Sequence, residues 1–201
     1  MHLVFKLPIT NYLITNLTTV SPTPELPDGF MYHPGFLTEQ EEQELLETIR
    51  SLSFENFNFH GYIAKRRIVQ YGMEYSSSTR KAVPTHALPD NLLPYRNRAA
   101  QLVDISPESL VECIVTEYPP GAPIGWHRDA PQFEIVIGIS LGGSCRMRFK
   151  PWKAEGKITS VVLEPRSLYI ISGQSRWQWQ HSIPPVKETR YSITFRTLRE
   201  D

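Results

Sequence analysis

Near its C-terminus the chain reads RYSITFR over residues 190–196, and polar and apolar side chains alternate along this stretch. Successive side chains of a β-strand point to opposite faces, so the stretch has two unlike faces. The polar face carries Arg190, Ser192, Thr194 and Arg196, and the apolar face carries Tyr191, Ile193 and Phe195. The apolar face predicts a buried core. The polar face fits either a solvated sheet surface or a clamp in which guanidinium forks bind a small dicarboxylate.

Comparable short runs fill much of the chain upstream of this strand, separated by turns rich in Gly, Pro and Ser. We expect strands over residues 63–75, 111–118, 133–141, 145–150, 158–163, 167–172, 177–183 and 191–198. Short strands of this spacing, with such turns between them, are typical of an antiparallel β architecture.

Two helices are also predicted. Thr38 and Glu41 form a capping-box pair and apolar residues then recur at helical spacing, so we expect a helix over residues 38–52. A second helix is expected over residues 92–103, with Pro94 in its first turn. Helices and strands together predict an α+β, mainly β fold: a double-stranded β-helix (jelly roll) with the N-terminal helices packed on one face.

The domain organisation is expected to be simple. A segment rich in Pro and Gly separates residues 1–26, an N-terminal arm or early strand, from a single domain over residues 27–201. No run approaches the roughly 18 apolar residues that a membrane-spanning helix needs, and the first twenty residues lack the features of a secretory signal. Two cysteines are too few for a disulfide scaffold, which favours a reducing compartment. We therefore expect a monomer without membrane contact, cytoplasmic or, in a eukaryote, also nuclear.

The charge is balanced overall but not along the chain. Twenty-one basic and twenty-one acidic residues cancel, which argues against a strongly cationic, sequence-blind nucleic-acid binder. Residues 61–100, however, hold seven basic and two acidic residues, a net charge of +5. The basic ones are Lys65, Arg66, Arg67, Arg80, Lys81, Arg96 and Arg98. They fit either a solvated surface or a local anion-binding surface.

The candidate metal ligands begin in the sequence WHRD at residues 126–129. In an extended chain His127 and Asp129 share a face, so an imidazole and a carboxylate point into one space, although a surface salt bridge has the same spacing. His181, about fifty residues later, adds a second imidazole or is a buried structural histidine. Two imidazoles and one carboxylate form the facial triad that leaves open positions on Fe(II), and zinc accepts the same donors.

Several motifs, in their order and spacing, resemble the AlkB-type Fe(II)/2-oxoglutarate-dependent dioxygenases. They are Tyr118-Pro119-Pro120-Gly121, His127-Arg128-Asp129, Ile139-Ser140-Leu141-Gly142, Ser175-Arg176, His181 and the strand at 190–196. The resemblance covers about residues 27–199. It implies Fe(II), 2-oxoglutarate as co-substrate and O2, with the catalytic metal held by His127, Asp129 and His181.

The resemblance also implies contacts to the co-substrate. Arg190 would bind the distal carboxylate of 2-oxoglutarate, and Arg196 would lie near the carboxylate that chelates iron. Tyr118 would hydrogen-bond the co-substrate. At Thr116 this chain carries a hydroxyl where many members carry an amide.

The implied activity is oxidative demethylation or hydroxylation of a modified base in single-stranded nucleic acid, DNA or RNA. The spacing from Arg176 to His181 and the segment 66–75 are more similar to the tRNA-modifying branch than to the DNA-repair members, which carry an acidic residue at the position of Pro131. Candidate substrate contacts are Arg66, Arg67, Tyr71, Tyr75 and Arg176. The two tyrosines suit base stacking, although plain core packing is the more common use of such an aromatic residue.

Two other functions fit the sequence. The neutral net charge and Pro131 favour a hydroxylase or demethylase of a protein or small molecule. A third hypothesis is a catalytically silent binding module on a jelly-roll scaffold, because fold alone does not dictate activity. The presence of all three metal-ligand candidates and of both arginines argues against that module.

Overall fold

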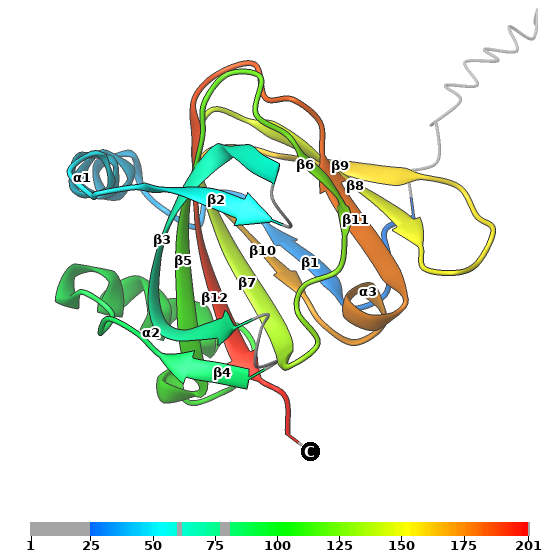
Figure 1. The fold of residues 1–201 in the computed structure, drawn as a ribbon, viewed down its shortest axis with the longest axis horizontal. Helices are drawn as coiled ribbons and strands as arrows, with labels where there is room; N and C mark the ends of the chain where they lie inside the picture. Colours follow the sequence, from blue (N-terminus) through cyan, green and yellow to red (C-terminus); the bar gives the residue numbers. More distant parts are fainter. Residues whose placement is uncertain (1–24, 60–61, 77–80, 201) are drawn as a thin grey trace, which may run out of the picture.

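The computed structural model describes residues 25–59, 62–76 and 81–200 (Figure 1). The side chains of residues 57–59, 62, 74–76 and 81–82 also lie outside the description. The expected N-terminal arm, residues 1–26, falls almost wholly outside the described residues and stays a prediction.

Within the described residues, twelve strands form two antiparallel sheets, which confirms the mainly β jelly roll (Figure 1). The larger sheet has the order β1 (Phe30–His33), β10 (Ser167–Ile171), β7 (Phe133–Gly142), β12 (Arg190–Leu198), β5 (Leu110–Tyr118), β3 (Tyr62–Ser76) and β2 (Glu55–Phe59), with β4 (Lys81–Pro84) paired to β3. The smaller sheet has the order β6 (Ile124–His127), β11 (Trp179–Ile183), β8 (Cys145–Pro151) and β9 (Thr159–Leu163).

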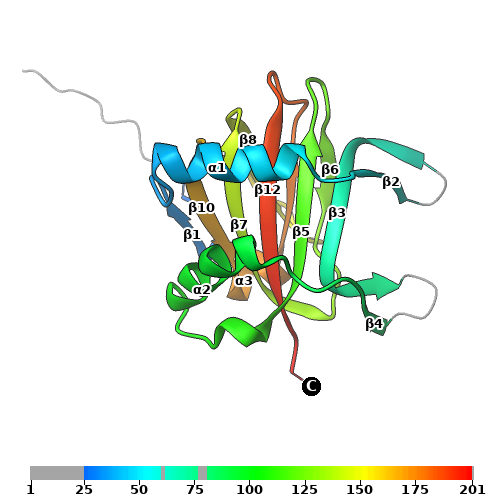
Figure 2. The ribbon, with the colours of Figure 1, turned by 90° about the vertical axis from the view of Figure 1, so that its left-hand side faces the viewer.

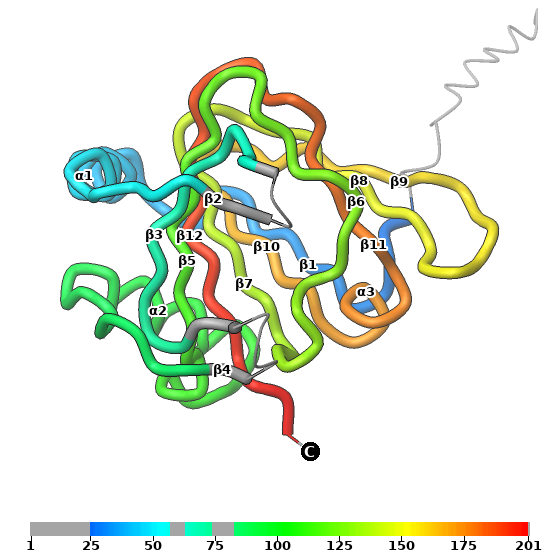
Figure 3. Tube along the Cα trace, in the orientation of Figure 1, coloured from blue at the N-terminus to red at the C-terminus, as the bar shows by residue number. Residues whose placement is uncertain are grey.

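The C-terminal strand β12 lies inside the larger sheet, between β5 and β7, as the tube in Figure 3 makes easy to follow. Its alternation is the predicted one, because Tyr191, Ile193 and Phe195 are buried in the core. The opposite face is not a solvated surface, since Arg190 is 0% and Ser192 2% exposed. This face is turned toward the smaller sheet and is called the inner face below.

The predicted helices cover the other face of the larger sheet (Figure 2). α1 (Glu39–Arg50) begins at the predicted capping box, in which Thr38 and Glu41 exchange hydrogen bonds. α2 (Leu93–Gln101) follows a short 3-10 turn, η1 (Asp90–Leu92), and has its proline in the first turn as expected; a second turn, η2 (Pro107–Ser109), leads into β5. Leu45 and Ile49 of α1 and the alanines of α2 complete this core.

A second core fills the space between the two sheets. Met147, Phe149 and Ile183 of the smaller sheet pack there with Tyr169 and Ile171 of the larger sheet. The two sheets are therefore held face to face by apolar contacts, and polar residues of the inner face lie beside this core.

One expected strand differs from the structure. Residues 173–177 form a short helix, α3 (Gly173–Trp177), and β11 begins only at Trp179, so the prediction of one strand over 177–183 was wrong at its start. The reason is local, because Ser172 caps this helix: its backbone N–H donates to Ser175 Oγ at 3.1 Å. None of the helices within the described ranges is long and apolar enough to span a membrane.

Candidate active site

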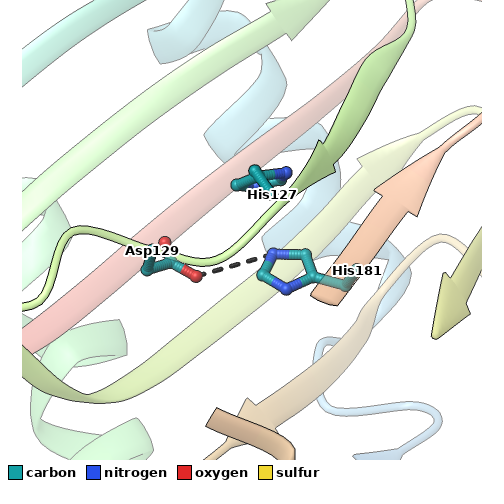
Figure 4. A group of neighbouring side chains, drawn as sticks. All are labelled: His127, Asp129 and His181. Atoms are coloured by element: carbon teal, nitrogen blue, oxygen red, sulfur yellow. Dashed lines mark ion pairs between the residues drawn. The ribbon is translucent and has the colours of Figure 1, made fainter. Parts of the chain in front are cut away.

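The three candidate metal ligands lie at one end of the space between the sheets. His127 is the last residue of β6 and faces His181 in the adjacent β11, and Asp129 follows two residues after His127. One ligand atom from each residue lies within 4.8 Å of the other two. The three side chains point toward one another (Figure 4). The structure thus brings together the triad that the sequence predicted.

The hydrogen bonds of the triad leave donor atoms available for a metal. Nδ1 of His127 lies 2.8 Å from the carbonyl oxygen of Gly125, which leaves Nε2 as the ligand atom. Nε2 of His181 lies 3.5 Å from Oδ2 of Asp129. That Oδ2 is buried and accepts no hydrogen bond from any described residue. A buried carboxylate oxygen without a donor suits coordination to a cation.

The protonation states fit the same use. Burial, with the neighbouring His127, lowers the pKa of His181 to about 3, and burial also lowers the pKa of His127. Burial opposes ionisation of Asp129, but Arg196 and the two imidazoles hold the pKa of its carboxyl well below the usual range. At neutral pH the site therefore offers two neutral imidazoles and a carboxylate, the forms in which these groups bind a metal.

A chain of hydrogen bonds runs from the triad into the larger sheet. Arg196 donates to Oδ1 of Asp129 from Nη2 at 2.6 Å and from Nε at 3.1 Å, and its Nη1 donates to Glu112 at 2.5 Å. Gln70 of β3 donates to the other oxygen of Glu112 at 2.8 Å. Sequence reasoning missed Glu112 and Gln70. The alternation of β5 carries a signal for Glu112, which shares its face with Thr116 and Tyr118.

Arg190 lies at the opposite end of the inner face and is fully buried. Its Nε donates to Ser140 Oγ at 3.0 Å, and its guanidinium carbon lies 5.0 Å from the centre of the Tyr118 ring. Nη1 and Nη2 have no hydrogen-bond partner among the described residues. A buried guanidinium fork with two free donors requires an anion, so the residues present fit a carboxylate ligand.

The other two residues predicted to contact the co-substrate are on the same inner face. Tyr118 is opposite Arg190, and Thr116 is opposite Ser192, in the register of β5 and β12. Both are buried. Their roles toward 2-oxoglutarate stay predictions, but the structure places all four predicted residues, including Arg190 and Arg196, on one surface.

Tyr169 of β10 is a further inner-face residue that the sequence analysis did not identify. Its ring lies directly over Gly138, where an added Cβ would be only 2.2 Å from Cζ of the tyrosine. Burial raises the pKa of Tyr169 to about 12, so its hydroxyl stays protonated. A glycine in the neighbouring strand is therefore what makes room for this ring beside Arg190.

The predicted substrate residues do not gather at one place. Arg66 is half-buried, and its positive charge helps to lower the pKa of His127, so it lies on the side of the metal site. Arg67 points the other way and pairs with Glu117 at 2.6 Å. Tyr71 is packed in the core beneath the helices, so of the two uses considered for it the structure shows core packing. The side chain of Tyr75 lies outside the description.

Arg176 of α3 is 1% exposed and holds the backbone beside the metal ligands. Its Nη2 donates to the carbonyl oxygens of Asp129, Ala130 and Phe133 at 3.2, 2.7 and 2.7 Å. The structure therefore places Arg176 as a support for the segment that follows Asp129 and also among the residues that line the cavity beside Asp129, and its predicted contact with a substrate stays a prediction.

In the described parts of the basic segment 61–100, part of the positive charge is neutralised by ion pairs. Of its seven cations, Arg67, Arg96 and Arg98 form ion pairs with Glu117, Glu108 and Glu41. Their carboxylate partners come from distant parts of the chain, which segment charges cannot reveal.

A cavity of about 300 Å³ opens beside Asp129. Its walls include Arg128, Asp129, Pro131, Trp152, Trp177 and Gln180. Arg128 crosses it, with its guanidinium carbon 4.4 Å from the centre of the Trp152 ring and Nη1 donating to the carbonyl oxygen of Trp177 at 3.1 Å. Flat aromatic faces thus lie next to a candidate metal ligand.

A jelly roll with two imidazoles, one carboxylate and an inner-face arginine defines the class of metal- and 2-oxo-acid-dependent oxygenases. Residues 29–196 match the model of the 2OG-Fe(II) oxygenase superfamily, and the chain belongs to that family, as an AlkB-like member. It is therefore an enzyme of the dioxygenase type that uses Fe(II) and 2-oxoglutarate, which sets aside the silent binding module.

Curated relatives support the same placement. The chain is 28% identical over 190 residues to the uncharacterized protein L905 of Acanthamoeba polyphaga mimivirus, with 85% of each covered. It is 30% identical over 173 residues to the tRNA (carboxymethyluridine(34)-5-O)-methyltransferase alkbh8 of Xenopus tropicalis, and the match covers 82% of this chain but 26% of that protein. It is 29% identical to the alkylated DNA repair protein ALKBH8 homolog of Arabidopsis thaliana, with 79% of this chain and 51% of that protein covered.

Solved structures show the same fold. OsALKBH1 superposes with a TM-score of 0.69 at 19% identity and covers 88% of this chain and 100% of its own. A Trichoplax adhaerens prolyl hydroxylase superposes with a TM-score of 0.61 at 16% identity, with 85% and 83% covered.

Proposed function

We propose that this dioxygenase oxidises a modified base in single-stranded nucleic acid, either by removing an N-methyl group or by leaving a stable hydroxyl. The observation that carries the proposal is the cavity beside Asp129, which has two indole rings and a guanidinium in its walls. Bases stack on such flat faces, and a base in single-stranded nucleic acid is free to enter a side pocket.

The names of relatives support this substrate class. One group is named as methyltransferases of a tRNA wobble uridine, and a Danio rerio relative, 25% identical over 176 residues, as a probable RNA/DNA demethylase. The chain spans about a quarter of the vertebrate methyltransferases, so the activity of those whole proteins is not carried over.

The roles of this chain's residues follow from the geometry. His127, Asp129 and His181 would hold Fe(II), which together with 2-oxoglutarate and O2 would supply the oxidation of a C–H bond. Arg196 keeps Asp129 ionised and oriented. Arg190 would fix the distal carboxylate of 2-oxoglutarate through its two free donors.

The test measures two products at once. Iron-loaded protein is supplied with 2-oxoglutarate and O2, with and without single-stranded oligonucleotides carrying methylated adenine, cytosine or uridine. Formaldehyde formed in step with succinate is expected for demethylation. A hydroxylated base detected by mass spectrometry, without formaldehyde, is expected for hydroxylation. If no oligonucleotide stimulates succinate formation or is altered, the nucleic-acid substrate is wrong.

Asp129→Ala is the control for the metal. It removes one of three protein ligands and leaves Arg196 without its partner, so succinate formation should disappear with every substrate. Substituting Glu108, an exposed residue paired with Arg96 on the helix side, should leave succinate formation unchanged.

A second candidate, oxidation of a protein or small molecule, is favoured by the zero net charge and by Pro131 at the edge of the cavity. Under this hypothesis succinate forms slowly without oligonucleotide. A fractionated mixture of peptides or metabolites should then contain a fraction that raises the rate of succinate formation.

A further inference from the structure

The outer face of the smaller sheet carries positive charge only. In β8, Cys145, Met147 and Phe149 point into the core between the sheets, so Arg146, Arg148 and Lys150 point outward. The four strands of this sheet read IGWH, CRMRFKP, TSVVL and WQHSI, with three cations and no carboxylate. We call Trp126, Arg146, Arg148 and Lys150 the basic face.

Five cations elsewhere in the described structure have carboxylate partners, and three of them lie on the helix side of the larger sheet. On the helix side of the larger sheet, Arg96, Arg98 and Arg166 form ion pairs with glutamates. In the described ranges, no carboxylate lies within 4.0 Å of the three cations of the basic face or of the adjacent Arg128 and Lys153. The outer face of the smaller sheet thus presents positive charge that no described carboxylate neutralises by direct pairing.

The groups of the basic face are held in place by neutral neighbours. Two cations lie near the Trp126 ring, with Cζ of Arg148 at 4.9 Å and Nζ of Lys150 at 4.8 Å from its centre. Arg148 Nε donates to Ser182 Oγ at 3.1 Å, and Arg146 Nη1 donates to Ser160 Oγ at 3.1 Å. These contacts orient the cations without removing their charge, so a bound anion would meet a partly ordered surface.

The basic face is continuous with the candidate active site. Trp126 and His127 are neighbours in β6, and alternation puts His127 inside at the triad and Trp126 outside. Arg128 follows and, with Trp152, borders the cavity beside Asp129. A strand that lies on the basic face would therefore pass the entrance of the cavity.

We propose that the basic face binds the sugar–phosphate backbone of single-stranded nucleic acid and so presents a base to the cavity beside Asp129. The inference deepens the proposed function and rests on it. Regularly spaced phosphates match the cations of the basic face, which have no carboxylate partner among the described residues. Contacts to phosphates are shared by RNA and DNA, so we expect both to bind.

The test is the salt dependence of binding, measured by fluorescence anisotropy with labelled RNA and DNA oligonucleotides on metal-free protein. The double variant Arg148→Gln/Lys150→Gln removes two phosphate contacts. Each contact to a single strand contributes about 0.7 to the slope of log K against log salt concentration, so the slope should fall by about 1.4. Arg146→Gln, at an exposed position that does not endanger folding, should lower it by about 0.7.

The matched control is Arg96→Gln/Arg166→Gln, which removes the same charge from two ion-paired arginines on the helix side. It should keep the wild-type slope. Circular dichroism and substrate-free succinate formation confirm that the Arg148/Lys150 variant is folded with an intact metal site.

The outcomes separate the two proposals. If the control lowers the slope as much as the Arg148/Lys150 variant, or neither changes it, the basic face is not the docking surface, even when methylated oligonucleotides are oxidised. If the slope falls as expected but no oligonucleotide is oxidised, the docking surface stands and the proposed function fails. If the variant loses affinity for acidic peptides but binds oligonucleotides like the wild type, the occupant is a protein and the proposal is overturned.

Discussion

Arg196 holds Asp129 through two nitrogens, Nη2 at 2.6 Å and Nε at 3.1 Å, both to the same oxygen, Oδ1. The other carboxylate oxygen, Oδ2, faces His181. The guanidinium of Arg196 thus occupies one carboxylate oxygen of Asp129 and leaves the other, Oδ2, available to a metal.

Arg196→Lys should weaken metal binding while leaving the triad itself unchanged. A lysine offers a point charge in place of a planar fork, so it cannot make both contacts to Asp129 and the third to Glu112. Loss of such an orienting partner typically costs about 10–100-fold in metal affinity. Competition for Co(II) against a chromogenic chelator measures this directly. Wild-type affinity in the variant would show that Arg196 does not orient Asp129.

Arg190→Met should have opposite effects on ligand binding and on stability. Loss of a desolvated charge pair costs about 2–5 kcal/mol, so 2-oxoglutarate affinity should fall by about 30-fold or more. The free protein should become equally or more stable, because a buried guanidinium with two unused donors is replaced by an apolar chain. Thermal melts with and without 2-oxoglutarate test both effects. A variant that is destabilised and binds 2-oxoglutarate normally would contradict the assignment.

The metal-free protein should lose stability as the pH falls from 7 to 4. The pKa of His181 is about 3 in the folded protein and about 6.5 in the unfolded chain, so between these values only the unfolded chain binds the proton. The free energy of unfolding should then decrease by up to about 1.4 kcal/mol per pH unit from this histidine, and His127 acts in the same direction. Urea unfolding at pH 7, 6, 5 and 4 measures the slope. His181→Gln should flatten it, and an equally steep slope in that variant would assign the effect to other groups.

Gly138→Ala should disturb the inner face by displacing Tyr169. The new Cβ would lie 2.2 Å from Cζ of the ring, and overpacking of this kind costs about 1–3 kcal/mol. In a Tyr169→Leu background the same substitution should cost clearly less, because the ring is gone. Equal costs in the two backgrounds, measured by urea unfolding, would show that the two residues are not coupled.

The sequence predicted what depends on local pattern. The alternation in residues 190–196, the capping box of Thr38 and Glu41 and the two histidines with Asp129 are all found as expected. The missed features depend on pairing between distant segments. Glu112 gains its role only because β5 pairs with β12 in a register that places it opposite Arg196.

The same reason limits what segment charges can predict. For residues 61–100 they left open a solvated surface or an anion-binding surface, and ion pairs with remote glutamates neutralise Arg67, Arg96 and Arg98. The basic face is formed by β8 and by Trp126 of β6, and residues 145–153 carry four cations and no carboxylate, a local excess that the sequence analysis did not single out. Only the fold shows which cations lack a partner.

The helices and the smaller sheet, which lie on opposite sides of the larger sheet, differ in the sign of their net charge. The two helices α1 and α2 carry five glutamates and three arginines, whereas the smaller sheet, on the other side of the larger one, carries three cations and no carboxylate. The charges of these elements would give the molecule an electric dipole across its thickness although its isoelectric point is near 7.0. A polyanion approaching in solution would be turned toward one side before any contact forms.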